Sequence, residues 1–119
     1  MNLRDAKISE CDADYQSLVR DAIEKGASSI HIEVREGSAT IKYRIKPLLK
    51  QMQVLSEDHA RKMVSTIYRS LTQEDDIEFS EFKLNNWSGY KEIDEVNVKI
   101  RFASIPNYPY GFDVVLGLN

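Results

Sequence analysis

Apolar residues recur every three or four positions in two segments, a pattern that predicts two amphipathic helices. The first helix is predicted to begin at Asp12 or Asp14, either of which can cap it, and to stop at Gly26. The second is predicted to begin at Ser56, a good N-cap residue, with two acidic residues in its first turn. The predicted core faces are Tyr15, Leu18, Val19, Ala22 and Ile23 in the first helix, and Ala60, Met63, Val64, Ile67, Tyr68 and Leu71 in the second.

Elsewhere apolar and polar residues alternate, which is typical of strands with one buried face. Residues 30–35 and 39–45 alternate in this way on either side of Gly37 and predict a β-hairpin with one apolar and one charged face. Further strands are predicted at 48–54, 77–84, 96–104 and 113–118, and residues 85–94 are predicted to be a polar turn region.

The resulting order is α-β-β-β-α-β-β-β, which predicts an α+β fold: a two-layer sandwich with helices on one face of a mainly antiparallel sheet. A length of 119 residues suits a single hydrophobic core. We expect residues 1–11 to form a flexible N-terminal segment and residues 12–119 to form one domain.

The composition narrows the class of protein. Hydrophobic residues make up 42% and charged residues 29%, which is typical of a soluble globular protein. The net charge of −3 argues against a general nucleic-acid binder, because phosphate neutralisation needs a basic surface. Cys11 is the single cysteine and cannot form an internal disulfide. With no long apolar run and a charged N-terminus, the sequence predicts a cytoplasmic protein.

Residues that could carry catalysis are scarce. The sequence lacks the GxxxxGK(S/T) phosphate loop of ATPases. His31, His59 and Cys11 fall in different predicted elements and do not have the spacing of metal ligands. The acidic run at 74–78 is typical of a solvated loop. We therefore expect no catalytic residue, no metal site and no cofactor in this chain.

One face of the predicted hairpin is charged, and a later strand adds two further cations. Two interpretations are open for this face: cross-strand ion pairing on a solvated surface, or an anion-binding surface in which arginines contact phosphate oxygens. Its residues are His31, Glu33, Arg35, Lys42, Arg44, Lys99 and Arg101.

Four short segments resemble motifs of a known ATPase superfamily. Residues 27–33 read ASSIHIE and resemble the ASDIHIE motif of the type II secretion, type IV pilus and conjugative type IV secretion ATPases. Residues 41–45 (IKYRI) are similar to the family's vRyRiDG strand, residues 76–80 (DIEFS) to its eiDFSf segment, and residues 98–102 (VKIRF), with Pro106 and Gly111, to its strand and Pro-Gly turn. The motifs span residues 13–118 in the family's order.

The chain departs from the family pattern at several positions. Ser29 replaces the aspartate of the first motif, and Phe112-Asp113 stands where many members have Gly-Glu. Lys46-Pro47 replaces an Asp-Gly turn, so this connection cannot be a type I′ turn. The family's PQDGR segment, which supplies an arginine to the nucleotide, is not recognisable.

The resemblance implies a PAS-like N-terminal domain that acts as a lid over ATP and Mg²⁺ held by a RecA-like motor domain, in a bacterial hexamer. It implies that Arg101 is the arginine that meets the nucleotide on closure, with Lys99 and Arg44 as further candidates. For His31 and Glu33 it implies a structural role in the first strand. The implied partners are the motor domain, neighbouring subunits and inner-membrane secretion or pilus platform proteins, with no direct contact to nucleic acid.

An alternative is a stand-alone PAS-like adaptor that binds a ligand or a partner protein. An apolar pocket with converging polar groups would favour this alternative, whereas a solid core with a basic outer face would favour the lid. Trp87 and the corner formed by Tyr108, Pro109 and Tyr110 are candidate partner contacts.

Overall fold

The computed structural model describes residues 3–72 and 79–118. Its elements follow the predicted order of two helices and six strands. They are α1 (Leu3–Glu24), β1 (Ser29–Val34), β2 (Ser38–Ile45), β3 (Leu48–Ser56), α2 (Glu57–Thr72), β4 (Asn85–Ile93), β5 (Val96–Pro106) and β6 (Phe112–Leu118).

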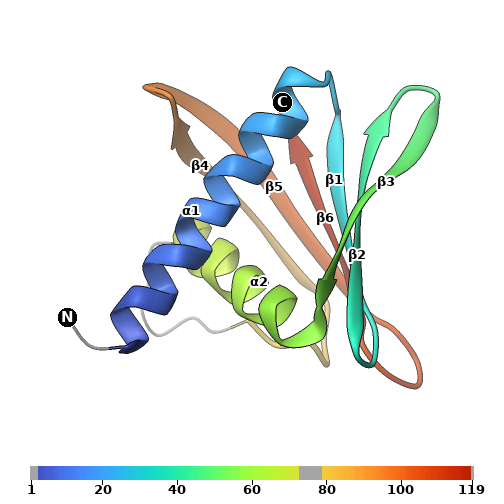
Figure 1. Cartoon of the computed structure of the whole chain (residues 1–119). Helices are drawn as coiled ribbons and strands as arrows, with labels where there is room; N and C mark the ends of the chain where they lie inside the picture. The colour runs from blue at the N-terminus through green and yellow to red at the C-terminus, as the bar shows by residue number, and fades with distance from the viewer. Residues whose placement is uncertain (1–2, 73–78, 119) are drawn as a thin grey trace.

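The six strands form one sheet in the order β3-β2-β1-β6-β5-β4, and every neighbouring pair is antiparallel. Two three-stranded meanders therefore meet at the central β1–β6 pair. Both helices lie on the same face of the twisted sheet, between its two edge strands (Figure 1). This arrangement confirms the predicted α+β fold. Neither helix, over the part of the chain described, is long and apolar enough to cross a membrane.

The core lies between the helices and the sheet, because β1, β2, β5 and β6 turn alternate apolar positions toward α1 and α2. The edge strand β3 contributes little to it, since Leu48, Leu49 and Val54 are exposed. In β1 and β2 the buried and half-buried positions alternate as predicted. The residues predicted to join the first hairpin to the second helix are almost fully buried: Ile30, Ile32, Ile41, Tyr43, Val64 and Ile67.

The ends of the helices agree only in part with the prediction. Helix α1 begins at Leu3, so Asp12 and Asp14 lie inside the helix and the prediction that either caps it is wrong. Ile23 was predicted to lie in the core but is 44% exposed. Gly26 ends the helix as predicted, with a φ of 75°. The N-terminal segment was predicted to be flexible, and this stays a prediction, although its helix begins at Leu3.

Helix α2 begins where the sequence indicates. The Oγ atom of Ser56 accepts a hydrogen bond of 3.2 Å from the backbone N–H of His59, which is the N-cap geometry expected of serine. Its buried residues include all six of the predicted core face.

The two-residue turns between β2 and β3 and between β4 and β5 have different backbone conformations. Lys46 and Pro47, linked by a cis peptide bond, connect β2 to β3, and Lys46 has no positive φ, as expected from the departure from Asp-Gly. Asp94 and Glu95 connect β4 to β5 with φ angles of 50° and 69°, the backbone signature of a type I′ turn.

The prediction for the segment before β5 is wrong. Residues 79–84 form a loop rather than a strand, and residues 85–93, predicted to be part of a turn, form strand β4. Residues 77 and 78 of the predicted strand lie outside the described residues. The loop is held by the buried side chain of Asn85, whose amide donates hydrogen bonds to the backbone oxygens of Ser80 and Lys83, at 2.6 and 3.0 Å.

Gly89 explains why β4 reads as a turn in the sequence. A Cβ atom at this position would lie 2.8 Å from the backbone oxygen of Leu71, near the end of α2. The glycine therefore allows the helix to approach the strand closely, and it does not mark a turn. Local sequence carries no information about this contact, because the helix arrives from elsewhere in the chain.

Candidate functional site

The residues predicted to contact a nucleotide share the face of the sheet that the helices leave uncovered, called here the outer face. In β5, Ile100 and Phe102 are buried under the helices, so the alternating Lys99 and Arg101 point to the opposite side. The same alternation in β2 places Arg44 on the outer face, beside the buried Tyr43. The strands thus bring all three predicted cations to one surface.

The strand register aligns four residues in a row across the centre of the outer face. Ser29 of β1 pairs with Arg44 of β2 on one side and with Gly117 of β6 on the other. Gly117 in turn pairs with Arg101 of β5. Two small residues therefore separate two arginines, whose backbones lie about 14 Å apart, given a spacing of about 4.8 Å between strands.

Arg101 lies over the glycine of this row. A Cβ atom on Gly117 would lie 3.1 Å from both Nε and Nη2 of Arg101, so the guanidinium group extends across β6 toward β1. Arg44 forms no ion pair with any other described residue, and the same is true of Lys99. The row thus places one arginine over Gly117 and the other beside Ser29, and two cations on one surface suit an approaching anion.

His31 lies on the same face, next to this row. Its Nε2 atom is 2.9 Å from Oγ of Ser29 and shares a hydrogen bond with it. Burial lowers the pKa of His31, and the positive charge of Arg44 lowers it further. The imidazole is therefore held in its neutral form more strongly than a solvated histidine.

Ion pairs occupy the other end of the outer face. Nζ of Lys42 lies 3.1 Å from a carboxylate oxygen of Glu33, and the guanidinium of Arg35 lies 2.8 Å from Asp113. Cross-strand ion pairing, one of the two interpretations of this face, is confirmed for these residues. It does not extend to Arg44 or Lys99 among the residues described.

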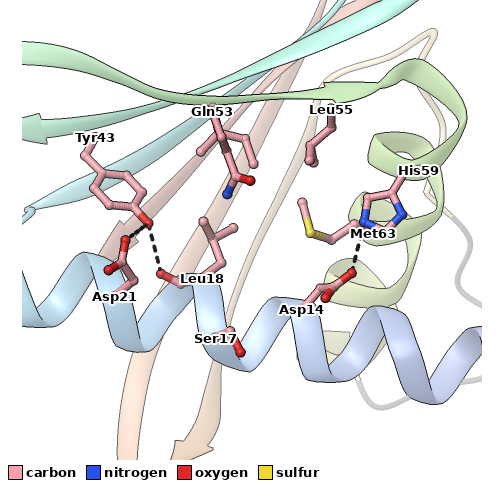
Figure 2. A pocket seen from close by; sticks show the side chains of 10 residues that line it. Asp14, Ser17, Leu18, Asp21, Tyr43, Gln53, Leu55, His59 and Met63 are labelled. Atoms are coloured by element: carbon pink, nitrogen blue, oxygen red, sulfur yellow. Dashed lines mark hydrogen bonds and ion pairs between the residues drawn. The ribbon is translucent and has the colours of Figure 1, made fainter.

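The opposite side of the molecule contains a groove that the sequence did not predict. Its volume is about 390 Å³, and it lies between α1, the β2–β3 hairpin and α2 (Figure 2). Four of its residues are apolar and the rest are polar. The lining residues are Asp14, Ser17, Leu18, Asp21, Ile41, Tyr43, Gln53, Leu55, His59 and Met63.

Polar contacts hold the side chains at the two ends of the groove. At one end the hydroxyl of Tyr43 donates to Asp21, at 2.8 Å (Figure 2). Lys25 also contacts Asp21, and these two partners, Lys25 first, lower the pKa of the carboxyl group. At the other end Nε2 of His59 lies 2.9 Å from Asp14, which links α2 to α1.

The sequence contained a partial signal for this groove. Asp14, Ser17 and Asp21 recur at helical spacing, so they share one stripe of α1 beside the core face. The prediction that Asp12 or Asp14 caps the helix hides this stripe, because a cap residue would lie outside the helix. The opposite wall could not be found in this way, because it depends on how the β2–β3 hairpin folds over the helix.

A third polar cluster joins the start of α2 to two loops. Glu57 accepts hydrogen bonds from the hydroxyl of Tyr110 at 2.5 Å, from the backbone N–H of Gly37 at 3.0 Å and from Nε of Arg61 at 2.7 Å. These partners, with Tyr110 the strongest, lower the pKa of Glu57 to about 2. Tyr110 is thus tied to α2 although it is 43% exposed, whereas Tyr108, in the same corner, is 95% exposed.

Among the described residues, no group of three or more His, Cys, Asp or Glu side chains is placed to hold a metal ion. The acidic run at Glu74, Asp75, Asp76 and Glu78 lies outside the described residues. No protein-family model matches the chain, and no curated protein matches it either.

Proposed function

We propose that this chain is a non-catalytic lid domain of a hexameric bacterial secretion, pilus or conjugation ATPase. In this proposal the outer face closes over ATP and Mg²⁺ held by a RecA-like domain in the cytoplasm, and nucleotide state sets the angle between the two domains. Inner-membrane platform proteins are the further partners.

One observation carries the proposal: Arg44 and Arg101 flank Ser29 and Gly117 on the face that α1 and α2 leave uncovered. Guanidinium groups bind phosphate oxygens through paired hydrogen bonds, and Gly117 leaves room for the guanidinium of Arg101 to lie across β6. The sequence motifs quoted above support the same role, because they place Arg101 at the position that meets the nucleotide.

Titration of the chain with Mg²⁺–ATP tests this proposal. We expect weak binding without hydrolysis, with the backbone amide signals of Arg44, His31 and Arg101 shifting most in two-dimensional NMR spectra. Bound phosphate also stabilises the imidazolium form, so the lowered pKa of His31 should rise when ATP is added.

Matched variants separate this site from general attraction to cations. Arg101→Ala and Arg44→Ala should each weaken ATP binding, whereas Arg69→Ala, an exposed cation on α2, should not. In a protein that includes the motor domain, Arg101→Ala should lower ATP turnover about tenfold or more, because a lost charge-assisted contact costs about 1.5–3 kcal/mol. Equal effects of all three variants, or ATP hydrolysis by the chain alone, would contradict the proposal.

A second candidate function is binding of a partner protein, independent of any ATPase. The groove between α1 and the β2–β3 hairpin favours it, because an apolar floor with converging polar groups is the usual form of a binding site.

A further inference from the structure

The groove combines an apolar floor with an acidic wall. Leu18, Ile41, Leu55 and Met63 provide apolar surface, and Asp14 and Asp21 stand on α1 about two turns, or about 10 Å, apart. Their side chains are 43% and 40% exposed, so both carboxylates are accessible from solvent. Among the described residues, Asp21 contacts Lys25, just after the end of α1, and Asp14 contacts His59, which is cationic only when protonated.

The outer lip of the groove is the edge of the sheet. Among the strands of residues 3–72 and 79–118, β3 is the terminal one: it pairs with β2 on one side and with no described strand on the other. Figure 2 shows Gln53 and Leu55 of β3 directed into the groove, toward α1. A terminal strand presents backbone N–H and C=O groups that can pair with an added strand.

We propose that this groove binds an extended basic segment of a partner protein, which pairs with the free edge of β3 and places lysine or arginine side chains against Asp14 and Asp21. Lysine and arginine suit both parts of the surface, because their aliphatic stems cover apolar residues while their charged ends meet carboxylates. An acidic segment would be repelled by the two carboxylates. A purely apolar segment would leave them with only the partners they have within the chain, which among the described residues are His59 for Asp14 and Lys25 with Tyr43 for Asp21. This proposal does not depend on the lid function, which uses the opposite face of the sheet.

The groove is large enough for this role. Its volume of about 390 Å³ falls in the usual range of binding sites and accommodates a few side chains rather than a whole helix. Strand addition supplies the remaining contacts through the backbone, so the segment needs only alternate side chains in the groove.

Peptides of defined sequence test the chemistry. The probe is a capped nine-residue peptide with threonine at odd positions and lysine, isoleucine, lysine and isoleucine at even positions. Two comparison peptides carry glutamate in place of lysine, or N-methyl groups on the backbone. We expect the lysine peptide to bind, the other two to bind at least tenfold more weakly, and the amide signals of Gln53 and Leu55 to shift most.

Variants of the chain test the site. Asp14→Asn should weaken binding of the lysine peptide about threefold to tenfold, as for a partly exposed ion pair, and Asp21→Asn should act similarly. Asp58→Asn is the matched control, because its side chain is 80% exposed on α2 and does not line the groove. NMR spectra of the free variants show whether each keeps the native fold.

The alternatives have distinct outcomes. Equal affinity for the glutamate peptide would overturn the charge preference, and equal affinity for the N-methylated peptide would overturn strand addition. Three results would overturn the site itself. They are an equal loss of peptide affinity in Asp14→Asn and Asp58→Asn, amide shifts confined to the outer face, and no binding at millimolar peptide.

Discussion

The guanidinium group of Arg101 lies over Gly117, the residue paired with it on the neighbouring strand. This contact links two strands across the outer face and fixes where the arginine's charge is presented. A side chain at position 117 would occupy the same space, since its Cβ would lie 3.1 Å from two guanidinium nitrogens. The glycine thus makes room for a candidate nucleotide-binding group.

Gly117→Ala should therefore displace Arg101 without unfolding the protein. The obstructed group is the end of a flexible, exposed side chain, so we expect the free energy of unfolding to change by no more than about 0.5 kcal/mol. Binding of Mg²⁺–ATP should fall at least threefold. Urea denaturation and NMR titration measure the two effects. Val115→Ala, on the same strand and face, is the control, and unchanged ATP affinity in Gly117→Ala would show that the position of Arg101 is irrelevant.

The sequence predicted the layer arrangement well because hydrophobic period and burial agree in most elements. The alternation of Ile30, Ile32 and Val34, for example, corresponds to three fully buried side chains. β4 was missed because its glycine and asparagines resemble a turn. Gly89 instead allows the close contact with α2, and Asn85 holds the preceding loop. Strand alternation alone correctly predicted that Arg44, Lys99 and Arg101 lie on one face of the sheet. Their alignment with Ser29 and Gly117 depended on register, which single strands do not encode.

Gly89→Ala tests the contact that hid β4 from the sequence. The added methyl group would lie 2.8 Å from the backbone oxygen of Leu71 and 3.2 Å from its Cα, so α2 or β4 must shift. We expect a loss of about 1–3 kcal/mol in the free energy of unfolding, as for overpacked sites. Chemical denaturation measures it. Ser88→Ala, on the opposite face of the same strand, should change stability by less than about 0.5 kcal/mol. Equal stabilities of the two variants would mean that the close approach imposes no constraint.

The final prediction concerns acid stability and the cluster around Glu57. Hydrogen bonds from Tyr110, Gly37 and Arg61 lower the pKa of this carboxyl group to about 2 in the folded state, against about 4.3 in an unfolded chain. Because the folded pKa is the lower one, the group stabilises the fold above about pH 4.3. That contribution is lost as the pH falls from about 4.3 to about 2, where unfolding takes up a proton at this site.

Glu57→Gln should abolish this part of the pH dependence. The variant should be less stable than the wild type at neutral pH, because glutamine lacks the charge that Arg61 and the Gly37 N–H meet. Between pH 4.3 and 2 the free energy of unfolding of the variant should fall less steeply with pH than that of the wild type, because unfolding of the variant takes up at most one proton fewer. The two stability curves should therefore converge at low pH. Urea denaturation at a series of pH values measures both curves. Glu92→Gln is the control, because Glu92 is exposed on β4 and has no ion pair among the described residues. Its stability curve should run parallel to that of the wild type. If the stability curve of Glu57→Gln also runs parallel to that of the wild type, the cluster does not lower the pKa of Glu57 in the folded protein.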